Sequence, residues 1–254
     1  MCRLRNKRLC CLLGLFLIGS LCYAQEDEPT ISADRPGALT GPDVMPLHKL
    51  QWETGIAYES LVGDYRTFTL NNTLFRFGLF ENTELRIGTD FLFNENMDPK
   101  FGIAPLCIGL KTKLNEGERL LPSVALLAQL NSPHIGTKAL LPERLSPSLH
   151  LLFEHTLSDK FVLGYNIGAE WDDQAAAPAT FLGLGLYFDI TERVGTFVET
   201  YNYLHPEEEN QYLTEFGLTW LVSRRVQLDL AADLDFLNLN SYHLISFGIS
   251  WLIN

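Results

Sequence analysis

Ionisable side chains recur at every second position in several parts of this 254-residue sequence. In "TELRIGTDFLF" (83–93), Glu84, Arg86 and Asp90 alternate with apolar residues, and "VQLDLAADLD" (226–235) places three aspartates in the same way. A period of two puts one kind of side chain on each face of a β-strand. A charged face of this kind could line an aqueous lumen that attracts cations, or form a salt-bridged interior that fills a barrel. The sequence leaves both readings open.

The same alternation returns in about twelve segments, and it predicts the strands that must position these charges. No segment of useful length has a helical period instead. The second strand is irregular, because its apolar residues change parity part-way, and this predicts a β-bulge. The predicted strands lie near residues 49–59, 66–78, 83–93, 103–114, 123–130, 148–157, 161–171, 182–189, 197–201, 215–220, 226–235 and 245–251.

Three features predict that the apolar face points outward, towards lipid. Compact links such as "LSDK" and "SRR" alternate with longer ones such as "NENMDPK", as in outer-membrane barrels. Glycines share the face that carries the charges, where a crowded lumen needs small residues. Aromatic residues gather near the strand ends, with Trp52, Trp220 and Trp251 at one predicted rim and Phe91, Phe93 and Trp171 at the other. The alternative is a secreted soluble β-sandwich or barrel with the apolar face inward.

Residues 1–24 predict a secretory signal peptide, with a basic start, an apolar run from Leu9 to Leu21 and cleavage after Ala24. A retained membrane helix fits less well, since the run is short. Removing this segment changes the net charge from −12 to −16, because it carries four positive charges and no acidic residue. Such an acidic chain does not favour nucleic acid. Only Cys107 would remain, so no internal disulfide is expected.

Fifteen ionisable residues are predicted to line the lumen, and most of them are acidic. They are Glu53, Glu84, Arg86, Asp90, Lys111, Lys113, His150, Glu154, Glu170, Asp189, Glu199, Glu215, Asp229, Asp233 and Asp235. We expect no catalytic residues, no cofactor and no metal. Ser148 and His150 share a face, but neighbours two apart on one strand are usually too distant for a nucleophile and its base. The other histidines show no ligand spacing.

Residues 25–46 have no periodicity and are rich in Pro, Gly and Asp, which predicts an irregular segment before the barrel at 47–254. Within it, Asp34, Arg35, Pro36 and Gly37 form a candidate plug. Pro36 and Gly37 bend the chain, and Arg35 could form a bidentate pair with a lumen carboxylate. The alternative is an unstructured periplasmic leader.

Three stretches carry a family resemblance: "ISADRPGALTGPDVMPLHKLQWETGIAYE" (31–59), "LFRFGLFENTELRIG" (74–88) and "GLTWLVSRRVQLDLAAD" (217–233). The sequence resembles the outer-membrane family described as putative MetA pathway of phenol degradation, over nearly the whole chain after the signal peptide. The resemblance implies a signal-peptide-bearing barrel regarded as a transporter. One departure is the C-terminus, where Trp251 is followed by three more residues instead of ending the chain on an aromatic.

The sequence thus predicts an all-β transmembrane antiparallel up-and-down barrel of about twelve strands, exported to the outer membrane of a Gram-negative cell. Its expected partners are outer-membrane lipid, an unidentified small-molecule solute and, during biogenesis, the barrel-assembly machinery. The leading function is a channel or transporter through a narrow, mostly acidic lumen, and the family name gives no grounds for assigning phenol as cargo. The alternatives are a closed barrel with a structural or surface-interaction role and, third, an outer-membrane enzyme.

Overall fold

The computed structural model describes residues 29–61, 65–118, 121–171, 177–205, 210–239 and 241–253. The expected signal peptide at 1–24 lies outside these residues. Among the described residues, no helix is long and apolar enough to cross a membrane, and one short 3₁₀-helix spans Lys138–Leu140. The strands are β1 (Leu50–Leu61), β2 (Tyr65–Phe80), β3 (Thr83–Asn94), β4 (Phe101–Ile103), β5 (Cys107–Asn115), β6 (Ser123–Asn131), β7 (Ser146–Thr156), β8 (Phe161–Glu170), β9 (Ala179–Asp189), β10 (Val194–Leu204), β11 (Gln211–Ser223), β12 (Val226–Asp235) and β13 (Tyr242–Ile253).

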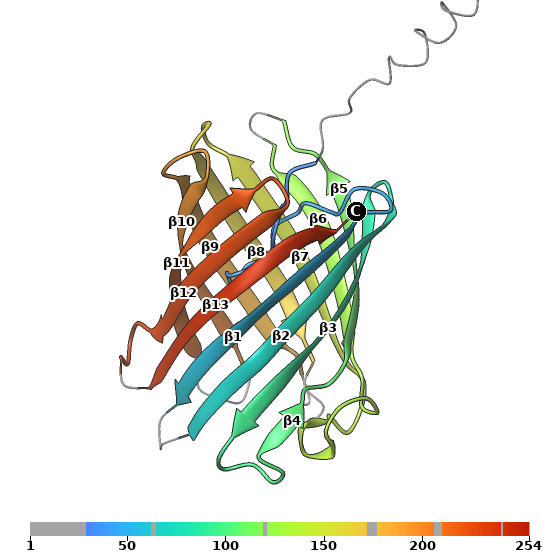
Figure 1. Cartoon of the computed structure of the whole chain (residues 1–254), viewed down its shortest axis with the longest axis vertical. Helices are drawn as coiled ribbons and strands as arrows, with labels where there is room; N and C mark the ends of the chain where they lie inside the picture. Colours follow the sequence, from blue (N-terminus) through green and yellow to red (C-terminus); the bar gives the residue numbers. More distant parts are fainter. Residues whose placement is uncertain are drawn as a thin grey trace, which may run out of the picture.

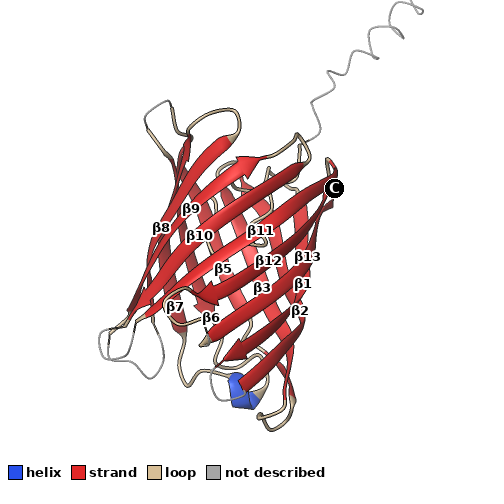
Figure 2. Ribbon diagram, turned by 90° about the vertical axis from the view of Figure 1, so that its left-hand side faces the viewer, coloured by secondary structure: helices blue, strands red, loops and turns tan. Residues whose placement is uncertain are grey.

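The strands form one closed antiparallel barrel, as Figures 1 and 2 show. Apart from β4 and β5, each strand pairs with its neighbour in sequence, and β1 pairs with β13 over twelve residue pairs, from Leu50 with Ile253 to Leu61 with Tyr242. β4 and β5 occupy one position, because both pair with β3 and are separated only by 104–106. Pro105 lies in that gap, where it can donate no backbone hydrogen bond. The barrel therefore has twelve strand positions, and the predicted fold is confirmed.

The two ends of the barrel differ in their connections. The end that carries the C-terminus has the links 81–82, 116–122, 157–160, 190–193 and 224–225, and we call it the turn rim. The opposite end has the links 62–64, 95–100, 132–145, 171–178, 205–210 and 236–241, and we call it the loop rim. β4 and the 3₁₀-helix lie at the loop rim (Figures 1 and 2). The alternation of compact and longer links expected from the sequence is present with two exceptions, the short link 62–64 at the loop rim and the longer link 116–122 at the turn rim.

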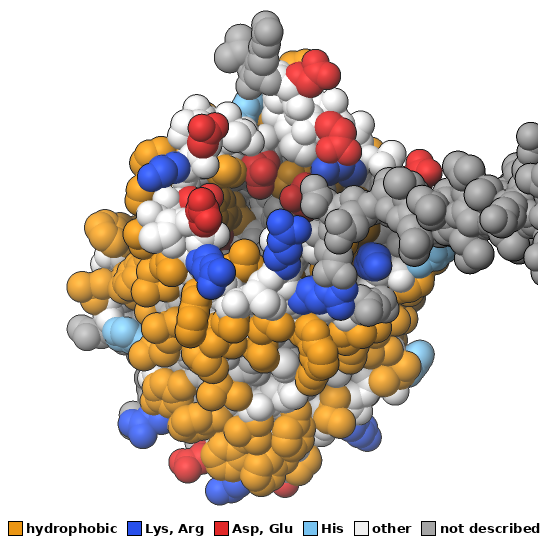
Figure 3. Space-filling model, turned by 45° about the horizontal axis from the view of Figure 1, so that its top comes forward, with side chains coloured by type: hydrophobic (Ala, Val, Ile, Leu, Met, Phe, Trp, Pro, Cys, Tyr) orange, Lys and Arg blue, Asp and Glu red, His pale blue; other side chains and the backbone are white. Residues whose placement is uncertain are grey.

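Apolar side chains cover the outer wall, and the barrel encloses the charged ones. Ile56 and Phe247 are 57% and 49% exposed, whereas Glu53 and Glu84 are 0% exposed. Figure 3 shows the apolar wall below an opening around which charged side chains gather. The soluble alternative required the reverse arrangement and is therefore wrong. The buried apolar clusters are small and lie inside, such as Leu39 with Phe181, Tyr201 and Leu213.

The predicted bulge in the second strand is confirmed. The pairing of β2 with β3 shifts register between Thr69 and Asn71, so Leu70 is the extra residue. Phe68 and Phe75, which have opposite parity in the sequence, are consequently both exposed on the outer wall. The shift also turns Arg76 into the lumen, where it is 0% exposed.

The expected aromatic girdles are partly visible in the pairing. Trp52 and Trp251 are directly opposite each other on β1 and β13 near the turn rim. Phe91 and Phe93 contact Phe101 near the loop rim, with ring centroids 6.1 and 4.9 Å away. Trp171, which follows β8, differs because it lines two cavities at the mouth of the barrel.

Candidate functional site

Residues 29–46, which precede β1, lie inside the barrel, and we call them the inner segment (Figure 1). Its first part is anchored at the turn rim, where the Ile31 amide donates to the Arg224 carbonyl, 2.8 Å away. Ile31 and Met45 then pack together with Leu252, close to that rim. Between these two anchors, Asp34–Thr40 crosses the lumen and contacts several walls of the barrel.

Asp34 contacts three cations from the wall formed by β2, β3 and β5. Its carboxylate forms ion pairs with Arg86, with Arg76 Nη1 at 3.4 Å and with Lys111 Nζ at 3.2 Å. Burial alone would raise the pKa of Asp34, but the charges of Arg76, Lys111 and Arg86 outweigh it and hold the pKa well below its usual range. Asp34 is therefore ionised whenever the inner segment is docked.

Two wall carboxylates complete this cluster. Glu84 accepts both Arg76 Nε at 3.0 Å and Arg76 Nη2 at 2.9 Å, and also the Met45 amide at 2.8 Å. Glu53 accepts the Asp34 and Arg35 amides at 3.2 and 3.1 Å. Buried charges are tolerated when they are paired and hydrogen-bonded, and here each one has several partners. The cluster therefore fixes the inner segment to this wall.

Arg35 extends in a different direction and lies against the strand pair that closes the barrel. Gly55 on β1 and Gly248 on β13 are directly opposite each other, and a Cβ at either position would collide with the Arg35 guanidinium. The two glycines thus form a slot for this side chain. In the slot, Arg35 Nη2 and Nε donate to the two oxygens of Asp229 at 3.1 and 3.4 Å. Arg35 Nη1 donates to Asn72 Oδ1 at 3.1 Å.

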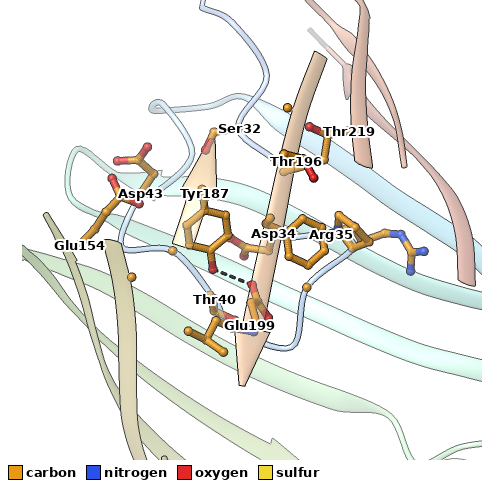
Figure 4. A pocket seen from close by; sticks show the side chains of 18 of the residues that line it. Ser32, Asp34, Arg35, Thr40, Asp43, Glu154, Tyr187, Thr196, Glu199 and Thr219 are labelled. Atoms are coloured by element: carbon orange, nitrogen blue, oxygen red, sulfur yellow. Dashed lines mark hydrogen bonds between the residues drawn. The ribbon is translucent and has the colours of Figure 1, made fainter. Parts of the chain in front are cut away.

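The far wall holds the inner segment through its backbone. Glu199 Oε2 accepts the amides of Ala38 and Leu39 at 2.8 and 3.0 Å, while its Oε1 accepts the Tyr187 hydroxyl at 2.6 Å (Figure 4). Asn166 exchanges two hydrogen bonds with the Thr40 backbone, at 2.9 and 3.0 Å. These contacts satisfy the amides of Ala38, Leu39 and Thr40 and the carbonyl of Thr40, which would otherwise be buried without hydrogen-bond partners.

Cavities lie on both sides of the inner segment. Towards the turn rim, a cavity of about 280 Å³ is lined by Glu154, Tyr187, Asp189 and Thr219 (Figure 4). Towards the loop rim, a cavity of about 660 Å³ is lined by Glu59, Asp90, Glu215 and Asp233. Asp34–Gly37 and Thr40 line both cavities. The inner segment is therefore the partition between these two cavities of the lumen.

The structure brings most of the predicted lumen residues to this partition or to the cavities beside it. Glu53, Glu84, Arg86, Lys111, Glu199 and Asp229 bind the inner segment, Asp34 and Arg35 belong to it, and Pro36 and Gly37 line both cavities. Glu154 and Asp189 line the smaller cavity, and Asp90, Glu215 and Asp233 line the larger one. His150 Nε2 and Glu170 Oε1 lie 3.2 Å apart and line a third cavity, of about 310 Å³.

Two predicted lumen residues lie away from Asp34–Thr40, the part of the inner segment that crosses the lumen. Lys113 binds Asp43 and Glu116 near the turn rim, at 3.0 and 2.8 Å. Asp235 is a correction: its carboxylate accepts the amides of Leu237 and Asn238 and so belongs to the turn between β12 and β13. An Asp side chain at the start of a turn commonly accepts hydrogen bonds from the turn amides that follow it. The alternation along the strand does not show that Asp235 is bound in this way.

The sequence analysis did not single out Arg76 and Asn166, which contact the inner segment, or Tyr187, which donates to Glu199 beside it. Arg76 lies beyond the bulge, and its inward direction follows from counting the extra residue at Leu70. The roles of Asn166 and Tyr187 depend on the partners that the closed barrel brings within reach, the Thr40 backbone and the Glu199 carboxylate, and no local pattern shows them. In the described part of the chain, no group of three or more His, Cys, Asp or Glu side chains is arranged to hold a metal ion.

An apolar outer wall, a charged lumen and a closed ring of antiparallel strands define a transmembrane β-barrel of the outer-membrane type. The chain belongs to the family described as "Putative MetA-pathway of phenol degradation", whose model matches residues 33–251. The resemblance noted in the sequence is thereby confirmed. No sequence among the curated proteins matches this chain.

Solved structures with the same architecture are outer membrane channels and porins. An outer membrane channel from Pseudomonas putida F1 is 12% identical with a TM-score of 0.62, and the match covers 87% of this chain and all of that one. The KdgM porin is 7% identical with a TM-score of 0.58, covering 80% of this chain and 99% of the porin. The NanC porin is 8% identical with a TM-score of 0.55, covering 80% and 100%. At these identities the likeness establishes the fold.

Proposed function

We propose that this barrel conducts small polar molecules across the outer membrane and that the inner segment controls the passage. The observation that carries the proposal is the pair of cavities, of about 280 and 660 Å³, separated only by Asp34–Thr40. This partition is held by hydrogen bonds, ion pairs and the packing of Leu39, and it is not a strand of the barrel. Non-covalent contacts of this kind can be released without unfolding the wall.

The apolar outer wall and the different links at the two rims support a position in the outer membrane and set the orientation of the barrel there. Bacterial barrels place their short turns in the periplasm and their longer loops outside the cell, so the turn rim faces the periplasm. The predicted signal peptide at 1–24 would direct export, and the barrel-assembly machinery would insert the chain. The inner segment would then enter the lumen from the periplasmic side.

The charges of the lumen favour cationic or neutral solutes. The larger cavity is bordered by the carboxylates of Asp34, Glu53, Glu59, Asp90, Glu215 and Asp233 and by only two guanidinium groups, of Arg35 and Arg86. A lumen lined mostly by one sign of charge concentrates ions of the opposite sign. We therefore expect cation-selective conductance.

Substitution of Arg35 tests the proposal. Arg35→Ala removes the three hydrogen bonds to Asp229 and Asn72, and we expect the open probability in planar bilayers to rise by about tenfold or more. Lys160→Ala, in an exposed turn, is the matched control and should behave as the wild type. Unchanged conductance of Arg35→Ala would contradict control by the inner segment.

The second candidate is a closed barrel with a structural role. It is favoured by the cluster around Asp34, in which Arg76, Arg86 and Lys111 are matched by Asp34, Glu53 and Glu84. Ion pairs that satisfy one another fill the lumen without offering free charges to a passing solute. Silence of both the wild type and Arg35→Ala in bilayers would support this candidate and refute the channel.

A further inference from the structure

Four aromatic rings form a continuous row from the mouth of the barrel to the inner segment. The ring centroids of His205 and Tyr203 are 6.4 Å apart, those of Tyr203 and Phe181 5.2 Å, and those of Phe181 and Tyr201 6.1 Å. His205 and Tyr203 line a cavity of about 540 Å³ at the loop rim. Tyr203 and Phe181 line the 310 Å³ cavity, and Tyr201 lines the 660 Å³ cavity. The aromatic row thus runs through three adjoining spaces.

An incompletely satisfied carboxylate lies at the inner end of the aromatic row. Asp233 is 4% exposed, and its Oδ2 accepts the Tyr201 hydroxyl. Its Oδ1 is buried and has no hydrogen-bond partner. Buried carboxylate oxygens normally have a donor, because leaving one unpaired costs free energy. Since Asp233 lines the 660 Å³ cavity, a donor carried by a ligand in that cavity could satisfy it.

A second carboxylate stands beside Asp233, and the local cations are already engaged. Glu215 on β11 is the direct cross-strand partner of Asp233 on β12, and it lines the same cavity. The guanidinium of Arg35 binds Asp229, and that of Arg86 binds Asp34 and Glu84. Two carboxylates facing each other across strands repel unless one of them is protonated or a positive charge lies between or beside them, so a bound cation would stabilise the pair in its ionised form.

We propose that the 660 Å³ cavity binds an organic cation, namely a primary ammonium attached to a planar apolar body. The ammonium donates to Asp233 Oδ1 and lies near Glu215, while the apolar body lies against the ring of Tyr201, which lines the same cavity. Ammonium groups bind carboxylates and aromatic faces together, since both offer negative potential. The inference deepens the proposed function, because it names the class of solute that the channel would take.

Calorimetric titration of the full-length barrel in detergent with benzylamine tests this inference. Benzyl alcohol and benzoate have the same ring with a neutral and an anionic head group, and they serve as ligand controls. We expect benzylamine to bind more tightly than benzyl alcohol by about tenfold or more and benzoate not to bind, and the preference should fall as salt is added. Equal binding of amine and alcohol, or no amine binding, would overturn the inference.

Matched variants locate the site. Asp233→Asn keeps the shape of the side chain and removes its charge, so it should abolish the preference for the amine over the alcohol. Asp189→Asn makes the same change on the other side of the inner segment and should bind as the wild type. If Asp233→Asn does not give a folded, heat-modifiable band, Glu215→Gln takes its place and should reduce amine binding. Retained preference in the folded variant would refute the assignment.

The outcome is separable from that of the channel proposal. Amine binding by a barrel that is silent in planar bilayers would refute conduction and retain this site. Conductance without any amine binding would retain the channel and refute the site.

Discussion

A single methyl group at Gly248 should release the inner segment without changing any charge. Gly248 faces Gly55 across the β1–β13 pair, and Arg35 occupies the space that a Cβ would need. The strand cannot retreat easily, because β13 is hydrogen-bonded to β1 on one side and β12 on the other. In Gly248→Ala, the Arg35 side chain must therefore leave its slot.

The size of the effect follows from what Arg35 loses. Its guanidinium makes two hydrogen bonds to Asp229, at 3.1 and 3.4 Å, and one to Asn72, at 3.1 Å. A hydrogen bond to a charged group contributes about 1.5–3 kcal/mol, and water replaces part of what is lost when the segment undocks. A net loss equal to one such bond shifts the ratio of docked to undocked segment by roughly 10- to 150-fold.

Two measurements would detect this shift. Open probability in planar bilayers should rise to about the level of Arg35→Ala, and proteolysis of the folded barrel within residues 29–46 should become faster. Gly41→Ala is the control, because it adds the same methyl group to the inner segment itself, where the nearest atom is Glu154 Oε2 at 3.8 Å. Wild-type behaviour of Gly248→Ala, or equal opening in Gly41→Ala, would refute the reasoning.

Two further predictions concern Leu39 and Asp34. Leu39→Ala removes a buried side chain from its contacts with Phe181 and Tyr201, so it should weaken docking by on the order of 2 kcal/mol and raise open probability while leaving ion selectivity unchanged. Asp34→Asn should open the channel at neutral pH, because Asp34 has a lowered pKa when docked and stabilises docking only while ionised. The difference in open probability between wild type and Asp34→Asn should stay constant from pH 8 to about pH 5, above the unperturbed pKa, and disappear as pH falls through the lowered pKa. A Leu39→Ala channel with altered ion selectivity would contradict the first prediction. A difference in open probability between wild type and Asp34→Asn that already decreases between pH 7 and pH 5 would contradict the second.

The strands and their inward faces could be predicted because a period of two is a local property. The run from Thr83 to Phe93 sends Glu84 and Arg86 inward, as their positions in the sequence indicate. The inward direction of Arg76 was not predicted, because the extra residue Leu70 exchanges the inward and outward positions for the rest of the strand. A bulge could be inferred from the mixed aromatic parity, but its position had to be known before Arg76 could be assigned.

For the inner segment, the sequence could predict the type of contact but not the residues that make it. Arg35 was expected to meet a lumen carboxylate and does so, but the choice of Asp229 depends on how far the strands are staggered around the ring. Asp34 was noted only as a member of the candidate plug, and its three cationic partners come from three different strands. Contacts between residues so far apart in the chain are set by the closed barrel and not by local pattern.

The position of the Arg35 slot also implies an order of events during folding of the barrel. Gly55 belongs to the first strand and Gly248 to the last, so the slot does not exist until the two ends of the sheet have met. Arg35 reaches Asn72 on β2 and Asp229 on β12, and it thus connects the strands on either side of the closing pair. The slot can therefore be filled only after ring closure, so Arg35 cannot hold the N-terminal chain across the lumen until the two ends of the sheet have met.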